Sequence, residues 1–200
     1  ELFAQAFEGD PTIGESMRAD LQAIIDRDPA CDKYSKPLLF FKGFQTIQTH
    51  RVAHWLWLNK RKYLALLMQS RVSEVFGADL HPAAVIGKGI MVDHATGIVI
   101  GETAVVGDNV SILHGVTLGG TGKECGDRHP KIGDGVLIGA HATILGNISI
   151  GEGAKIGAGS VVMENIPAHC TAVGVPAEVK GCPKNDSPAL FMDHYVHGHI

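Results

Sequence analysis

The sequence lacks the basic surface that nucleic-acid binding requires. Its 200 residues include 17 Lys and Arg against 21 Asp and Glu, which gives a formal charge of −4 at pH 7. The densest basic run is Lys60-Arg61-Lys62, which is too short to form a stripe along a nucleic acid. We therefore expect no nucleic-acid partner.

Long hydrophobic runs are also absent from the sequence. No apolar segment reaches the roughly 20 residues that a membrane-spanning helix needs, and no secretory signal peptide is visible. The chain opens with Glu1 rather than Met, so residues can be missing before it. We expect a cytoplasmic protein without a membrane anchor.

Cysteine is scarce, with four residues spread along the chain: Cys31, Cys125, Cys170 and Cys182. None of them lies at a spacing from another Cys that is typical of a metal site. Isolated cysteines in a cytoplasmic protein are usually free thiols. We therefore predict four reduced thiols and no bound metal.

What the sequence does contain is a repeat of six residues, in which an aliphatic residue is usually followed by Gly. The aliphatic positions are Ile86, Val92, Ile100, Val106, Ile112, Leu118, Ile132, Ile138, Ile144, Ile150, Ile156 and Val162. A helix of period 3.6 cannot keep such a repeat on one face, and so many glycines would destabilise it. A short fixed period is typical of a solenoid, and three hexads form one triangular coil of a parallel β-helix.

The residues before the repeat show helical spacing of apolar side chains. We predict a first helix that starts at a capping box, Thr12-x-x-Glu15, and ends at Asp28-Pro29, because the residue before proline avoids the α region. Two more helices are expected over residues 36–59 and 61–76, the last ending at Gly77.

These patterns divide the chain into three parts and predict an α + β protein. We expect a helical domain over residues 1–78, a parallel β-helix over residues 79–182 and a flexible, exposed tail over residues 183–200.

Two irregularities interrupt the repeat, and such irregularities often mark function. The first is a slip of two residues between Val92 and Ile100. The second is the polar, Gly-rich segment 119–131, which we predict to be a loop extruded from the coil.

Candidate catalytic side chains lie beside both irregularities. Asp93 replaces the usual Gly of the repeat and is followed by His94, while Asp79 lies about one coil earlier. A carboxylate that orients an imidazole is the minimal general base. Arg128, with His129 next to it in the loop, offers a guanidinium fork for a carboxylate. The set suits a small amino acid with a hydroxyl group to activate.

Several motifs resemble those of the serine O-acetyltransferase family. They are Asp79-Leu-His-Pro-Ala-Ala, Met91-Val-Asp-His-Ala-Thr-Gly-Ile-Val-Ile-Gly-Glu-Thr-Ala, Val116-Thr-Leu-Gly-Gly-Thr-Gly-Lys, Gly126-Asp-Arg-His-Pro-Lys-Ile, Arg27-Asp-Pro-Ala, Asp32-Lys-Tyr-Ser-Lys-Pro-Leu-Leu and Lys42-Gly-Phe-Gln. The resemblance covers roughly Asp10 to Gly181. It implies a left-handed β-helix and the transfer of an acetyl group from acetyl-CoA to L-serine, the first step of cysteine biosynthesis.

The resemblance also implies roles for individual residues. His94 matches the family's general base, which activates the serine hydroxyl for direct attack on the thioester, and Asp79 matches the carboxylate that supports it. The residues that match the serine pocket are Asp28, Pro29, Asp93, Arg128 and His129. Cysteine is expected to compete in this pocket as a feedback inhibitor, because it carries the same ammonium and carboxylate groups.

Acetyl-CoA is expected in a groove between protomers of a trimer or of a dimer of trimers. The residues that match the family's CoA contacts are Gly120, Thr121, Ala140 and Ala158. Ala140 and Ala158 are three hexads apart, so we expect them to stack one coil above the other. The C-terminal Ile200 matches the residue that family members insert into O-acetylserine sulfhydrylase, the cysteine synthase that consumes the product.

Three other functions are compatible with parts of this pattern. A γ-carbonic-anhydrase-like metal hydratase has the same coil, and here His94 and His114 occupy equivalent positions one coil apart, with His129 or His141 as a third ligand. A scaffold would bind the sulfhydrylase without catalysis. An acetyltransferase of the same fold could act on another small acceptor.

Overall fold

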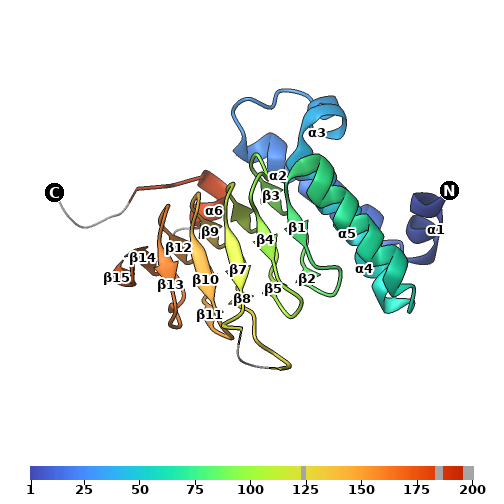
Figure 1. Cartoon of the computed structure of the whole chain (residues 1–200). Helices are drawn as coiled ribbons and strands as arrows, with labels where there is room; N and C mark the ends of the chain where they lie inside the picture. The colour runs from blue at the N-terminus through green and yellow to red at the C-terminus, as the bar shows by residue number, and fades with distance from the viewer. Residues whose placement is uncertain (123–124, 183–186, 196–200) are drawn as a thin grey trace.

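The computed structural model describes residues 1–122, 125–182 and 187–195, and it has the predicted fold class, with helices followed by a parallel coil of short strands (Figure 1). Five helices come first: α1 (Leu2–Gly9), α2 (Thr12–Arg27), α3 (Ser35–Phe40), α4 (Lys42–Leu58) and α5 (Lys62–Phe76). None of the helices in these ranges is long and apolar enough to cross a membrane.

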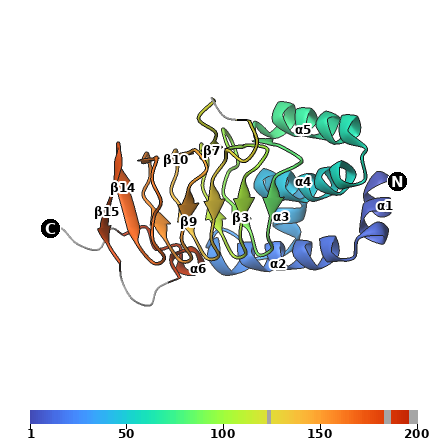
Figure 2. The same cartoon turned by 90° about the horizontal axis from the view of Figure 1, so that it is seen from below.

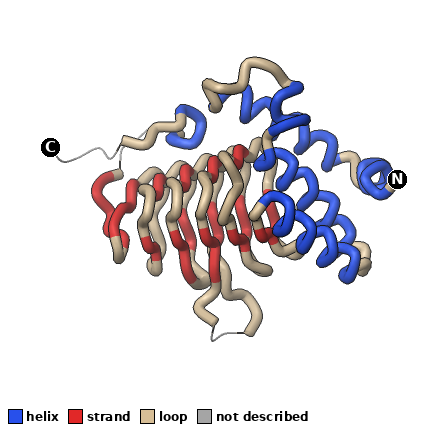
Figure 3. The backbone as a smooth tube through the Cα atoms, turned by 45° about the horizontal axis from the view of Figure 1, so that its top comes forward, coloured by secondary structure: helices blue, strands red, loops and turns tan. Residues whose placement is uncertain are grey.

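The second part is a coil of short strands that extends away from the helices. The strands are β1 (Asp79–Leu80), β2 (Val85–Ile86), β3 (Met91–Val92), β4 (Val99–Ile100), β5 (Val105–Val106), β6 (Ser111–Ile112), β7 (Thr117–Gly119), β8 (Lys131–Ile132), β9 (Leu137–Ile138), β10 (Thr143–Leu145), β11 (Ser149–Ile150), β12 (Lys155–Ile156), β13 (Val161–Val162), β14 (Thr171–Gly174) and β15 (Ala177–Gly181). Figures 2 and 3 show them stacked rung upon rung.

The strands form the three walls of a parallel β-helix. Sheet A has the order β1-β4-β7-β10-β13, sheet B the order β11-β8-β5-β2, and sheet C the order β15-β14-β12-β9-β6-β3. Neighbouring strands within the coil pair in parallel, and among the strands of the described ranges only the final pair β14–β15 is antiparallel. The predicted β-helix is therefore present.

The aliphatic position of each hexad points into the coil. In sheet A, Ile100, Leu118, Ile144 and Val162 lie in register on successive rungs and are at most 1% exposed. Each such side chain contributes about 1.5–3 kcal/mol by leaving water. This internal ladder holds the rungs at a constant spacing, so the corners between the walls are also in register.

The helices follow the predicted limits with two differences. The predicted helix over residues 36–59 is two helices, because Phe41 is extended (φ −89°, ψ 103°) and packs against the cluster that contains Ile24 and Phe44. The capping box is also wrong, since Asp10 Oδ1 accepts the bonds from the backbone N and hydroxyl of Thr12 instead.

Two buried arginines attach the helices to the coil. Arg27, at the end of α2, donates to the carbonyl oxygen of Gly89 at 3.1 Å and to Ser111 Oγ at 3.2 Å. Arg51 of α4 forms a buried ion pair with Asp20 of α2, with its Nη2 2.7 Å from Oδ2, and the same nitrogen donates to the carbonyl oxygen of Gly87 on the coil at 2.7 Å. These bonds fix the C-terminal end of α2, and with it Asp28, against the first coils.

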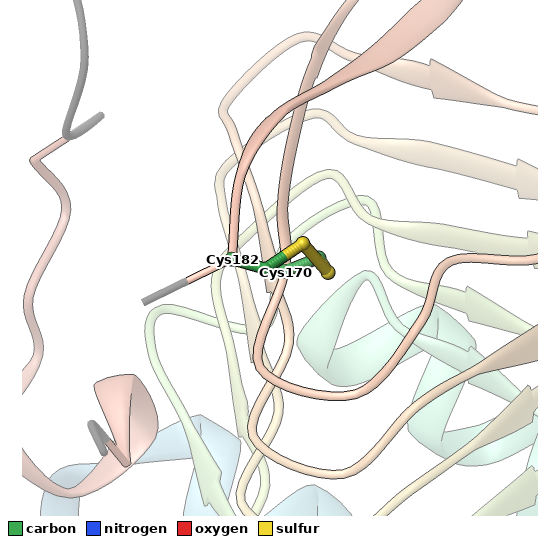
Figure 4. The surroundings of a disulfide bond; sticks show 2 residues. All are labelled: Cys170 and Cys182. Carbon is green, nitrogen blue, oxygen red and sulfur yellow. A yellow bond between two sulfur atoms is a disulfide. The ribbon is translucent and has the colours of Figure 1, made fainter. Parts of the chain in front are cut away.

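The cysteine prediction is wrong for one pair, because Cys170 and Cys182 form a disulfide (Figure 4). The antiparallel pair β14–β15 folds the chain back, which brings Cys182 beside the start of β14 although 12 residues separate it from Cys170. Cys31 and Cys125 are free thiols.

The sequence indicated a flexible tail, but the residues of the tail that the structure describes pack on the coil. It contains α6 (Pro188–Phe191), and the carbonyl oxygen of Ala189 accepts a hydrogen bond from Ser111 Oγ at 3.0 Å. Asp193 forms an ion pair with the buried Lys155 at 3.0 Å. Lys155 occupies an outward position in its hexad, so its role as an anchor for the tail is visible only in the tertiary structure.

The contact between α4 and the coil generates a stability prediction. A Cβ at Gly43 would lie 2.0 Å from the carbonyl oxygen of Val92, a backbone atom that cannot rotate away. We expect Gly43→Ala to lower the free energy of unfolding by about 1–3 kcal/mol, measured by urea unfolding.

The matched control is Gly14→Ala in α2, where the nearest atom to an added Cβ is 3.5 Å away. That change should stabilise the protein by up to about 1 kcal/mol, because Ala is the better helix former. Equal stabilities of the two variants would contradict the close approach of α4 to β3.

Candidate functional site

The catalytic candidate His94 lies on the corner where the chain passes from sheet C to sheet A. We call the aligned residues 93–98, 113–116, 139–142 and 157–160 on this edge the histidine corner. Both His94 and Ala95 have positive φ values, 60° and 59°, in the turn formed by the two-residue slip. The side chain of His94 is 73% exposed there. The slip thus projects an imidazole outward from an otherwise regular rung.

A cavity of about 450 Å³ lies beside His94, between the coil and the helices. It is lined by Ile24, Asp28, Ala30, Phe40, Phe41, Lys42, Gly43, Met91, Val92, Asp93 and His94. The structure therefore brings together three of the predicted residues, Asp28, Asp93 and His94, from two parts of the chain. Pro29 follows Asp28 directly but does not line the cavity.

The polar groups of this cavity suit an ammonium group and a hydroxyl group. Asp93 Oδ1 lies 3.7 Å from His94 Nε2, which is too long for a hydrogen bond. Asp28 Oδ1 accepts a hydrogen bond from the backbone N of Ala30 at 2.8 Å. Lys42 donates to the hydroxyl of Thr96 on the same corner. Two carboxylates thus lie at the cavity beside an accessible imidazole.

Asp79 lies one rung before His94 but contacts a different residue. Its Oδ1 accepts a hydrogen bond from Gln69 Nε2 of α5 at 2.6 Å. Asp79 and His94 both lie in the described part of the chain, and no hydrogen bond joins them. The predicted pair of Asp79 and His94 is therefore not formed within this chain.

The second group of predicted residues is at the base of the extruded loop. Arg128 Nη2 donates to Glu102 Oε2 at 2.8 Å, and the backbone N–H groups of Arg128 and His129 both donate to Thr103 Oγ1. The bond from Arg128 holds the pKa of the Glu102 carboxyl below its usual value. Glu102 was not identified from the sequence, although its place directly after Gly101 in the repeat is a usable signal.

His129 is buried under the loop. It is 7% exposed, and its Nδ1 accepts a hydrogen bond from the backbone N of Thr103 at 3.2 Å. Burial, and then the nearby charge of Arg128, lower the pKa of His129. A neutral His129 with its proton on Nε2 is thus the form that this geometry holds.

The two groups lie at opposite ends of the strands of sheet A. His94 precedes β4 on the histidine corner, whereas Glu102 and the loop residues follow β4 and β7 on the next corner. Strand β4 and the turn residues on both sides of it lie between the two groups, so the full width of sheet A separates them. A single chain therefore does not bring Arg128 and His94 onto one amino acid.

The residues predicted to contact CoA also fall into two groups, one on the histidine corner and one at the base of the extruded loop. Ala140 and Ala158 lie one coil apart on the histidine corner, as predicted, and the backbone N of Gly159 donates to the carbonyl oxygen of Ala140 at 2.8 Å. Gly120 and Thr121 follow β7 at the base of the extruded loop.

Two further histidines form a column with His94 on the histidine corner. The ring of His114 lies 5.8 Å from that of His94 and 4.9 Å from that of His141, and both contacts are edge-to-face. The sequence placed His114 one coil from His94 but assigned it no role in acetyl transfer. In the described ranges, no group of three or more His, Cys, Asp or Glu is arranged to hold a metal ion.

Comparison with known proteins identifies both parts of the chain. The sequence profile "Serine acetyltransferase, N-terminal" matches residues 1–49, and "Bacterial transferase hexapeptide (six repeats)" matches residues 129–163. The serine acetyltransferase of Salmonella typhimurium is 58% identical over 198 residues, which cover 99% of this chain and 72% of the relative.

Solved structures agree with this match. A serine acetyltransferase in complex with cysteine has a TM-score of 0.96 and 53% identity, covering 98% of this chain and 76% of its own. The serine acetyltransferase of Brucella abortus in complex with coenzyme A has a TM-score of 0.88 and 56% identity, covering 91% and 74%. The overlap and the hexapeptide match are consistent with the left-handed β-helix that the resemblance implied.

Proposed function

The chain belongs to the serine acetyltransferase family, and we propose that it transfers the acetyl group of acetyl-CoA to the hydroxyl of L-serine. The products are O-acetylserine and CoA. The observation that carries this assignment to particular residues is the cavity where Asp28 and Asp93 flank the exposed imidazole of His94. Cysteine inhibits by occupying the same pocket, because it differs from serine only in the side-chain group that His94 would activate.

His94 acts as the general base in this reaction. Its imidazole takes the hydroxyl proton as the serine oxygen forms a bond to the acetyl carbon, the C–S bond of the thioester then breaks, and the proton passes to the sulfur of CoA. Positioned proton transfer of this kind contributes about 10²–10⁴-fold to the rate. Asp28 and Asp93 hold the substrate ammonium beside the base, and Pro29 fixes the chain that follows Asp28.

Asp79 is assigned as the carboxylate that orients His94 in the assembled enzyme. Gln69 occupies Oδ1 of Asp79, while Oδ2 has no hydrogen-bond partner among the described residues. That oxygen remains available as an acceptor for an imidazole N–H. The assignment rests on the family resemblance. A contact between Asp79 and the imidazole of His94 requires that one of the two side chains moves, or that the imidazole belongs to a second chain.

We assign the substrate carboxylate to Arg128 and His129 of a neighbouring copy of the chain. The width of sheet A, which separates His94 from Arg128, is too long for one serine to span, so a complete pocket needs a second protomer. A trimer, or a dimer of trimers, would bring the extruded loop of one chain to the histidine corner of the next. In the single chain the guanidinium of Arg128 already holds a carboxylate, that of Glu102.

Acetyl-CoA lies along the same junction in this proposal. On one protomer, the small side chains of Ala140 and Ala158 form a surface that runs parallel to the coil axis. Gly120 and Thr121 of the neighbouring protomer form the opposite side of the junction. Small side chains let an extended pantetheine arm approach the backbone closely.

The predicted contact with O-acetylserine sulfhydrylase depends on Ile200, which lies outside the described residues. The ion pair between Lys155 and Asp193 supports a role for the tail, since it fixes the described tail to the coil close to where the remaining residues begin.

The base assignment predicts the effect of one substitution. His94→Ala should lower kcat by about 10²–10⁴-fold, because the hydroxyl loses its proton acceptor, while serine still binds. Free-thiol release from acetyl-CoA with serine, threonine and homoserine measures both the base and the preferred acceptor. A turnover close to that of the unchanged enzyme would exclude His94 as the base.

The carboxylate assignment predicts a different kinetic effect. Arg128→Ala should raise the serine KM at least about tenfold, because loss of a charge-assisted bond costs about 1.5–3 kcal/mol. The KM for acetyl-CoA should change little. Serine saturation that stays the same in this variant would show that the loop does not bind the substrate.

A mixing experiment tests whether two chains share each site. The His94→Ala and Arg128→Ala chains, each nearly inactive at low serine, should regain activity when unfolded and refolded together, since hybrid oligomers contain some junctions with neither substitution. The two proteins refolded separately and then combined serve as the control. No recovery in refolded oligomers that contain both chains would contradict a shared site.

A further inference from the structure

The backbone of Asp79 is fixed by the coil. Its N–H donates to the carbonyl oxygen of Ile98 at 2.8 Å, and the next residue, Leu80, is 4% exposed and belongs to the core of the coil. Because successive side chains of a strand point to opposite faces, the carboxylate of Asp79 points outward. The coil thus fixes where this side chain starts, but not the rotation of its carboxylate.

One side chain of the helical domain fixes that rotation. Gln69 donates from Nε2 to Asp79 Oδ1 at 2.6 Å, across the contact where α5 packs on β1. The chain turns between the two residues at Gly77, which has a φ of 69°. Since an ionised carboxylate only accepts hydrogen bonds, the amide presents its NH2 group here. The bond leaves Oδ2 of Asp79, which has no hydrogen-bond partner among the described residues, as the acceptor for a further group.

The position of Gln69 is itself fixed by packing. On α5, Ala65 and Val72 lie one turn to either side of it and are 0% and 7% exposed. Gln69 lines a cavity of about 10 Å³ between α4 and α5, and also an open groove that contains Asp79. A cavity of that size holds at most about one water molecule, so the amide cannot turn back into the helical domain. Its donor is therefore directed to the groove and to Asp79.

A neutral donor suits this place. When His94 takes the serine proton it becomes positively charged, and an ionised carboxylate beside it stabilises that charge. A Lys or Arg in place of Gln69 would neutralise the carboxylate, whereas an amide orients it and leaves its charge in place. The other carboxylate of the groove, that of Glu74, forms an ion pair with Arg71.

We propose that Gln69 is a positioning residue for acetyl transfer, which orients the carboxylate of Asp79 so that Oδ2 accepts the N–H of the imidazole of His94. The proposal rests on the function proposed above, and in particular on the pairing of Asp79 with that imidazole in the assembled enzyme. Gln69 contacts neither substrate and transfers no proton. It keeps the imidazole in the tautomer whose other nitrogen is free to take the hydroxyl proton.

Two substitutions of Gln69 test this role. Gln69→Met keeps the length of the side chain but removes the donor, and it should lower kcat about 10–100-fold, the typical effect of losing a group that orients a functional side chain. Gln69→Glu keeps the shape but places a second carboxylate against Asp79, so it should lower kcat at least as much. The KM values for serine and acetyl-CoA should stay within about threefold, because neither substrate touches Gln69.

A double substitution separates positioning from a general effect on the fold. Asp79→Asn alone should lower kcat at least about 100-fold, because the imidazole loses its carboxylate. Adding Gln69→Met to this variant should change kcat less than about threefold, since the carboxylate that Gln69 orients is already absent. A role of Gln69 in packing alone would lower kcat by the same factor in both backgrounds.

The control is Ser73→Ala. Ser73 lies one turn after Gln69 on α5 and lines the same groove, so this variant should turn over normally. A Gln69→Met enzyme with a kcat within about threefold of the unchanged enzyme would overturn the proposal. Equal losses from Gln69→Met with and without Asp79→Asn would overturn it too.

The outcome is separable from the function proposed above. If His94→Ala and Asp79→Asn lose activity while Gln69→Met keeps it, the base and its carboxylate stand and only the positioning role is excluded. If Asp79→Asn and Gln69→Met both turn over normally while His94→Ala is inactive, the assignment of Asp79 is wrong, and the positioning role with it. If all three variants are fully active, His94 is not the base.

Discussion

The stacking of aliphatic side chains inside the coil is the constraint on which the rest of the structure depends. Ile100, Leu118, Ile144 and Val162 fill one wall of the interior with almost no exposure, and each must be followed by a tight turn. Because the rungs cannot shift without exposing this ladder, every corner residue is held at a fixed height along the axis. The coil thereby places side chains on its edges with the regularity that a site for an extended cofactor needs.

The candidate functional residues are located where this regularity fails. The two extra residues after Val92 cannot fit inside the coil, so they project the turn that carries His94 outward with positive φ. The polar loop after β7 is excluded from the interior for the same reason, and it carries Arg128 and His129. Both departures leave the aliphatic ladder intact, which explains how one scaffold tolerates both the turn that carries His94 and the extruded loop.

The helical domain adds the third component of the site. Arg27 is held by carbonyl oxygens on the coil, and the residue after it, Asp28, therefore lies in the cavity with Asp93 and His94. Gly43 permits α4 to approach the carbonyl oxygen of Val92 closely, which forms another wall of the cavity. Substrate binding and helix docking are thus physically coupled, and a change that moves α2 also moves a carboxylate of the pocket.

The sequence by itself determined the β-helix, the slip, the extruded loop and the candidate residues, because a six-residue period has one stable solution and each departure from it is visible in one dimension. Only the tertiary structure decided which candidates meet. It joined Asp28 to His94 across the domain junction, separated His94 from Arg128 by the width of a wall, and paired Asp79 with Gln69 and Arg128 with Glu102. It also revealed the break at Phe41, the disulfide between Cys170 and Cys182 and the docking of the tail on Lys155. These features depend on contacts between segments distant in the chain, and a periodic pattern records only which face a residue occupies, not which side chain it meets there.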